Sequence, residues 1–152
     1  MWRRSSYKLC DFVTPNETEL GTLTGMTVAD GDEEAVVAAA RVLLSWGAGG
    51  VIVTMGSKGA VLVTGSGTDK DVVRVPAAIV PRDEVVDTVG AGDAFMGSFA
   101  VFTSLGHGPA EAATRAGVVA AESVKKKGAQ SSYACRSEFD AALFEVPPPV
   151  HK

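Results

Sequence analysis

The segment Gly50–Thr54, which reads G-V-I-V-T, constrains the fold of this chain most strongly. It is a short, uninterrupted β-branched run, and the tight turn M-G-S-K-G follows it directly. Such a run is typical of a parallel strand that is covered on both faces, as in α/β proteins. The sequence therefore predicts a sheet with helices packed against it.

Other predicted elements alternate around this strand. Strands are expected at Lys8–Thr14, Ala60–Thr64 and Val72–Pro76, and helices from Asn16 to about Leu23, at Glu33–Trp46, at Ala91–Leu105 and at Pro109–Lys127. Helices and strands alternate early and two helices come last, which predicts an α/β layered fold with a largely parallel sheet.

Size and charge narrow the class of protein. The chain has 152 residues, 46% of them hydrophobic, which fits one domain with a buried core. A net charge of -4 without a basic stripe argues against nucleic acid or an anionic membrane as the main partner. Cys10 and Cys135 lie far apart and indicate thiols in a reducing cytosol. His107 and His151 have no metal-ligand spacing.

The run D-T-V-G-A-G-D-A-F, residues 87–95, holds the strongest chemical signal. It opens a predicted helix, whose first N–H groups lack intrahelical acceptors and carry the positive end of the helix dipole. Glycines let an anion approach that backbone without meeting a Cβ. The amides around Gly90, Ala91, Gly92 and Asp93 are therefore a candidate phosphate cradle.

Asp93 would then lie where a phosphoryl group meets its acceptor. In phosphoryl transfer a carboxylate commonly takes the proton from the acceptor hydroxyl, so Asp93 is a candidate general base. The structural alternative is a first-turn acid that only interacts with the helix dipole, worth at most about 1 kcal/mol. A P-loop motif is absent from the sequence, and Phe95 stands where a dinucleotide fingerprint needs its third glycine.

Four segments in the same order resemble ribokinases of the PfkB carbohydrate kinase family. They are T-P-N-E-T-E at 14–19, V-T-M-G-S-K-G at 53–59, V-D-T-V-G-A-G-D-A-F-M-G at 86–97 and K-G-A-Q-S-S-Y at 127–133. The resemblance runs from about Cys10 to Phe144 and covers only the C-terminal half of such an enzyme. It implies a ribokinase-like three-layer α/β/α sandwich, truncated on its N-terminal side and lacking the β lid that forms the family's homodimer. Residues 1–7 would be an extension, 8–144 the kinase half and 145–152 a Pro-rich tail.

By resemblance, Asp93 is the catalytic base that also contacts the sugar, and Gly90, Ala91 and Gly92 form the anion hole. Asn16 and Glu19 match the family's N-x-x-E motif, in which Glu19 holds Mg²⁺ through water. The resemblance implies ATP-binding roles for the following residues: Asn16, Thr54, Met55, Gly56, Ser57, Lys58, Gly59, Gly92, Asp93 and Gly117.

The family also binds a monovalent cation, usually K⁺, beside the anion hole. The matching positions are Asp87, Val89, Ser123, Lys126, Gly128 and Ser132, of which Val89, Ser123, Lys126 and Gly128 would use backbone carbonyls. A cation behind the glycine turn would fix its backbone and add positive charge near the phosphate.

Simpler structural interpretations remain open for several of these residues. Asn16 and Glu19 could form only a helix cap, worth typically about 1 kcal/mol. Lys58 could be a solvated turn lysine, Asp87 a turn acid, and Lys125–Lys127 partners of a helix C-terminus.

Two functions follow from the resemblance. The first is a cytoplasmic enzyme, possible also in the nucleus, that uses ATP, Mg²⁺ and K⁺ to phosphorylate D-ribose to ribose 5-phosphate, with ATP and ribose as its partners. The second is a nucleotide-binding fragment that needs a complementary N-terminal half. Another PfkB sugar or nucleoside kinase is a third hypothesis.

Overall fold

The computed structural model describes residues 4–65 and 71–146. The chain divides into two compact units, Met1–Pro76 and Ala77–Lys152, which are described separately. From residue 147 on, the predicted Pro-rich tail lies outside the described residues.

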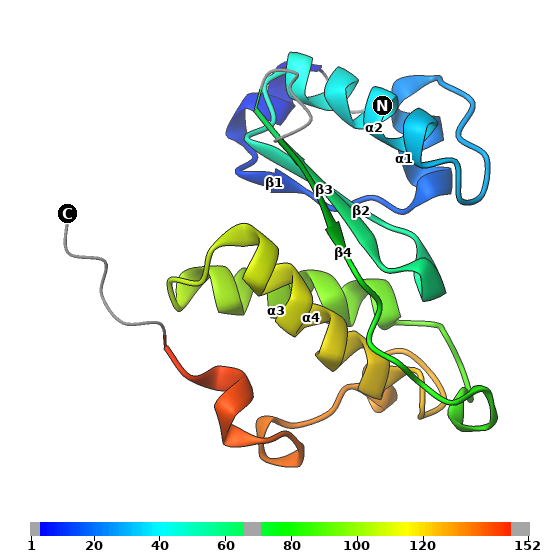
Figure 1. Ribbon diagram of the computed structural model, residues 1–152, viewed down its shortest axis with the longest axis vertical. Helices are drawn as coiled ribbons and strands as arrows, with labels where there is room; N and C mark the ends of the chain where they lie inside the picture. The colour runs from blue at the N-terminus through cyan, green and yellow to red at the C-terminus, as the bar shows by residue number, and fades with distance from the viewer. Residues whose placement is uncertain (1–3, 66–70, 147–152) are drawn as a thin grey trace. The chain divides into compact units, whose positions relative to one another are not determined.

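The first unit contains a sheet of four described strands in the order β1-β2-β3-β4 (Figure 1). The strands are β1 (Phe12–Val13), β2 (Gly50–Thr54), β3 (Ala60–Thr64) and β4 (Val72–Val75). Strand β1 is shorter than the predicted Lys8–Thr14, because Arg4–Leu9 forms a 3₁₀ helix instead. In that helix Tyr7 is buried, and its ring centroid lies 5.3 Å from that of Trp46.

The sheet is mixed where the sequence predicted a largely parallel one. Strand β1 pairs with β2 in parallel, whereas β2–β3 and β3–β4 are antiparallel pairs. The lengths of the connections explain this, because a parallel pair needs a crossover of a dozen or more residues and a short turn can only return the chain antiparallel. Two helices connect β1 to β2, but only Met55–Gly59 connects β2 to β3.

Helices α1 (Glu17–Thr24) and α2 (Glu33–Ser45) pack on each other, and α2 packs on β2 and β3 (Figure 1). The core of this unit includes Leu20, Val36, Leu43, Val51 and Val53, all fully buried. Asn16 caps α1 and Asp32 caps α2 through their side chains, and Gly25 ends α1 in the left-handed conformation. These helix ends lie where the sequence predicted them.

The second unit is built on α3 (Ala91–Ser104) and α4 (Pro109–Ser123), which pack along each other (Figure 1). Phe95, Phe99 and Phe102 of α3 are buried, as are three alanines of α4, because apolar residues at helical spacing form one face. Helix α4 ends at Ser123, four residues before the predicted Lys127. The amides of Lys125 and Lys126 instead bond to carbonyls three residues earlier, in tight turns.

Candidate functional site

The predicted site residues fall in both units. The first unit carries Asn16, Glu19 and the segment Thr54–Gly59, and the second carries Gly117 and the residues from Asp87 to Asp93 and from Ser123 to Ser132. Within each unit, most of the predicted residues are brought together by contacts between segments distant in sequence.

The first unit places the start of α1 beside the C-terminal end of β2. The amide of Thr54 donates to the Pro15 carbonyl at 3.0 Å, and Asn16 and Thr54 form an isolated parallel bridge. After Thr54 the chain turns through the short 3₁₀ helix Gly56–Lys58, and the Met55 amide closes the turn on the Gly59 carbonyl at 2.8 Å. The motif at Asn16 and Glu19 therefore lies next to the Thr54–Gly59 segment, at the C-terminal end of β2. We call residues Met55–Gly59 the nucleotide turn.

Asn16 and Glu19 form a complete capping box on α1. The Glu19 amide donates to Asn16 Oδ1 at 2.8 Å, and the Asn16 amide donates to Glu19 Oε2 at 3.0 Å. The interpretation of this pair as a helix cap is thus confirmed. Both side chains are exposed, and carboxylate oxygens suit Mg²⁺, so the pair also fits the predicted magnesium role.

In the second unit, Gly90 begins α3 in a conformation that only glycine adopts easily. Its φ is +88°, and no side chain caps the helix. A Cβ on Gly90 would lie 2.9 Å from Ala129 Cα and 3.2 Å from Tyr133 Cε1, whereas a Cβ on Gly92 would meet nothing within 4 Å. At Gly90 the turn is therefore packed against the loop that follows α4, whereas at Gly92 it is open to an approaching group.

Asp93 is exposed in the first turn of α3, as a base that meets substrate must be. Its Oδ2 lies 3.4 Å from the Tyr133 hydroxyl. Partial burial and the Asp93 charge raise the pKa of Tyr133, which keeps the phenol protonated as a donor. Sequence reasoning did not assign Tyr133 a role. The signal was its position at the end of the quoted segment K-G-A-Q-S-S-Y.

Asp87 hydrogen-bonds to two other residues of the predicted cation site. Its Oδ1 accepts the Val89 amide at 3.0 Å and its Oδ2 accepts the Gly128 amide at 2.9 Å. The bond from Val89 has the larger effect, and together the two bonds lower the pKa of Asp87 and keep it ionised. The amides of Val86 and Asp87 both bond to the Val124 carbonyl at the end of α4.

The other members of this set lie around the same end of α4. Ser123 and Ser132 are buried, and their hydroxyls donate to the carbonyls of Ala120 and Ala129. The Lys126 amide bonds to the Ser123 carbonyl, while its ammonium pairs with Glu138 at 2.7 Å. Carboxylate and carbonyl oxygens are the donors that suit a hard cation, and the set offers both kinds, although both Asp87 oxygens accept backbone amides in this structure.

Gly117 is the predicted residue that no described contact joins to the others. It lies in the middle of α4, where a Cβ would meet nothing within 4 Å. In the part of the chain that the structure describes, no three His, Cys, Asp or Glu side chains gather as a metal site, and no helix is long and apolar enough to cross a membrane.

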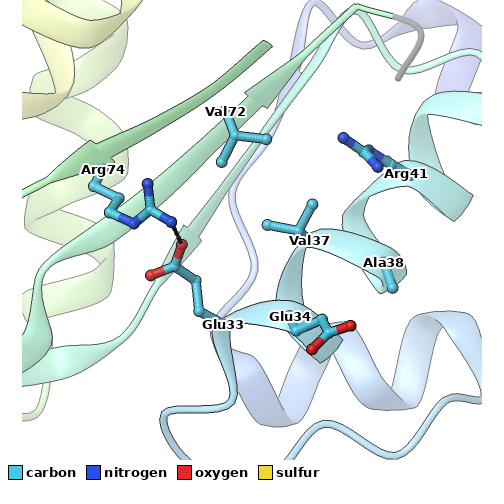
Figure 2. A pocket seen from close by; sticks show the side chains of 7 residues that line it. All are labelled: Glu33, Glu34, Val37, Ala38, Arg41, Val72 and Arg74. Atoms are coloured by element: carbon cyan, nitrogen blue, oxygen red, sulfur yellow. Dashed lines mark ion pairs between the residues drawn. The ribbon is translucent and has the colours of Figure 1, made fainter. Parts of the chain in front are cut away.

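A separate pocket of about 590 Å³ lies between α2 and β4 (Figure 2). Val37, Ala38 and Val72 line it together with charged side chains, and Glu33 pairs with Arg74 across it at 2.5 Å. None of the predicted site residues lines this pocket.

The sequence is similar to proteins of known function. Residues 4–135 match the model of the pfkB family carbohydrate kinases. A deoxyribokinase of Salmonella typhi is 48% identical over 135 residues, which cover 88% of this chain and 41% of that protein. A ribokinase of Haemophilus influenzae is 41% identical over 131 residues, 86% of this chain and 40% of its own length.

Solved structures show the same relationship. The ribokinase of Thermotoga maritima matches with a TM-score of 0.76 at 36% identity, covering 90% of this chain and 43% of that one. The Arabidopsis thaliana ribokinase, solved with ribose and ATP, also has a TM-score of 0.76, at 33% identity, covering 89% and 41%. The ribokinase-like α/β fold is thus confirmed, and the chain spans about two fifths of the length of these proteins.

Proposed function

Because this chain belongs to the pfkB family of carbohydrate kinases, we propose that it carries the phosphoryl-transfer part of an ATP-dependent sugar kinase acting on D-ribose. One observation supports this most directly: an exposed carboxylate, Asp93, stands in the first turn of a helix that begins at a left-handed glycine and has no side-chain cap. A carboxylate here would stand beside the first amides of the helix, of which that of Ala91 bonds to the Thr88 carbonyl at 3.3 Å.

In the proposed reaction, Asp93 takes the proton from the 5-hydroxyl of ribose as that oxygen attacks the γ-phosphorus of ATP in line. The O–P bond to the sugar forms, the bond to ADP breaks, and ribose 5-phosphate and ADP result. The amides of the Gly90–Gly92 turn stabilise the charge on the transferring group. The open space at Gly92 supports this role, because an anion could reach the backbone there.

The nucleotide turn is proposed to bind ATP mainly through its backbone. Gly56 and Gly59 have positive φ angles of 54° and 93°, and a Cβ on Gly56 would meet nothing within 4 Å, so a nucleotide could approach the backbone there. Asn16 and Thr54 adjoin it, and Gly117 is carried over from the family as a further contact. Glu19 would hold Mg²⁺ through water, and the metal would neutralise charge on the phosphates.

The cation role proposed for the Asp87 set is to hold the glycine turn in place. Asp87 already links the segment before α3 to the Gly128 loop, whose residue Ala129 lies against Gly90. A K⁺ ion bound by this carboxylate and the neighbouring carbonyls would stiffen that connection and add positive charge behind the anion hole.

The sugar needs a direct test, because a deoxyribokinase is 48% identical and a ribokinase 41% identical to this chain. The experiment is an ADP-release assay with D-ribose and with 2-deoxy-D-ribose, comparing the wild type with Asp93→Asn. The proposal expects ribose-dependent ADP and a loss of at least about a hundredfold in Asp93→Asn, the lower bound of general base catalysis. Turnover with deoxyribose alone would reassign the sugar, and a loss under about tenfold would refute the base assignment.

A second candidate is a nucleotide-binding module that becomes active only with a complementary N-terminal PfkB half. The chain spans 41% of the deoxyribokinase, and β1, a strand of two residues, ends the described sheet. An open sheet edge favours pairing with another chain or aggregation. This candidate predicts MgATP binding in calorimetry without ribose-dependent ADP, and ADP formation once the missing half of a ribokinase is supplied in trans. Turnover by the isolated chain would eliminate it.

A cytoplasmic location and the family's homodimer remain proposals. Gel filtration with light scattering would test the dimer.

A further inference from the structure

We propose that Asp30 and Gly31, in the loop between α1 and α2, hold Lys58 and thereby position the nucleotide turn. Glu17 of α1 supports this loop. We call Asp30 and Gly31 the bracket. The inference deepens the proposed function, because it concerns how the ATP-binding segment keeps its shape. All of the residues belong to the first unit.

The bracket holds Lys58 through an ion pair and through packing. Lys58 Nζ donates to Asp30 Oδ1 at 2.8 Å. The lysine stem also lies directly on Gly31, since a Cβ there would be 2.3 Å from Nζ, 3.1 Å from Cε and 3.5 Å from Cδ. Gly31 has a φ of +77°, so both its conformation and its surroundings favour glycine.

Glu17 connects the bracket to the first turn of α1. Its Oε1 accepts the Gly31 amide at 2.7 Å. Glu17 is the residue after Asn16, so the helix that carries the predicted magnesium motif also fixes the bracket. The start of α1 is therefore connected to the nucleotide turn twice: through the Pro15 carbonyl to Thr54, the residue before the turn, and through the bracket to Lys58.

This arrangement gives Lys58 a role that differs from that of a phosphate ligand. Its ammonium is paired with Asp30, and Asp30 and Glu17 together raise its pKa. A lysine engaged by carboxylates in the absence of nucleotide contributes by keeping the turn closed, so that the backbone groups of Gly56 and Gly59 are already in place. Its effect on nucleotide affinity would then depend on the ion pair and not on the charge at position 58 itself.

The test uses amide hydrogen exchange in the nucleotide-free protein, which requires no activity. NMR would follow the amides of Met55, Lys58 and Gly59, which hydrogen-bond inside the turn. Asp30→Asn and Lys58→Met should each speed this exchange about two- to fivefold, the range expected for an exposed ion pair. The double variant Asp30→Lys/Lys58→Asp should return it toward the wild-type rate. Glu34→Gln, which removes another acid near the start of α2, should leave it unchanged.

Calorimetry with MgADP on the same variants separates the two roles of Lys58. The inference expects affinity losses of similar size in the two single variants and recovery in the double variant. Unchanged exchange in both single variants would overturn it. So would a loss of more than about tenfold in Lys58→Met that exceeds the loss in Asp30→Asn and is not recovered, because that pattern identifies a direct phosphate ligand. If the wild type does not bind MgADP, the proposed function fails while the exchange data still decide on the bracket.

Discussion

Replacing Gly90 by alanine tests the geometry on which the proposed anion hole depends. The φ of +88° costs an L-residue roughly 1–2 kcal/mol. The new Cβ would also lie 2.9 Å from Ala129 Cα, a backbone atom that cannot rotate away. Displacing a packed segment typically costs about 1–3 kcal/mol. The two effects together predict a loss of about 2–5 kcal/mol in the free energy of unfolding.

Thermal melting followed by circular dichroism would measure this loss. For a chain of this size about 1 kcal/mol moves the midpoint by roughly 2–4 °C, so Gly90→Ala should melt about 4–20 °C lower. Gly97→Ala is the matched control, because Gly97 lies inside α3 and a Cβ there meets nothing within 4 Å. It should gain about 0.5–1 kcal/mol from helix propensity. Equal midpoints for Gly90→Ala and the wild type would refute the reasoning.

Substitutions at three further positions test other parts of the chain. Asn16→Ala should cost about 1 kcal/mol in urea unfolding, whereas Asn16→Asp should be neutral, because both Asn and Asp cap helices well. Phe102→Ala should cost about 3–5 kcal/mol, since this fully buried ring packs against the rings of His107 and Phe144, with centroids 5.8 and 5.4 Å away. The hydrogen bond from Arg115, and to a smaller extent that from His107, lowers the pKa of Glu111 in the folded state. Ionised Glu111 therefore stabilises the fold above its ordinary pKa of 4.5, and this stabilisation is lost as the pH falls through the folded-state pKa. Glu111→Gln should therefore be less stable than the wild type at pH 7 and converge with it in acid; a constant difference would contradict this.

The relation between sequence and structure differs from one element to another. The capping box at Asn16 and Glu19 was predictable because both hydrogen bonds lie within one helical turn. The prediction of a largely parallel sheet was wrong for β3 and β4, because apolar runs of this length do not reveal their partners. The short connection between β2 and β3 decides the direction of that pair. The end of α4 was also placed too late, since three lysines suit a helix terminus and a following turn equally well.

The sequence by itself determined the α/β class, the helix starts and the identity of the glycine turn, because helix capping and left-handed glycines depend on neighbouring residues. Only the tertiary structure decided which distant groups meet. Asp87 bonds to the amide of Gly128, 41 positions later, and the hydroxyl of Tyr133 reaches Asp93, 40 positions earlier. The bracket on Lys58 depends on a contact across 28 positions. Contacts of this range follow from how helices and loops pack, which local propensity does not encode.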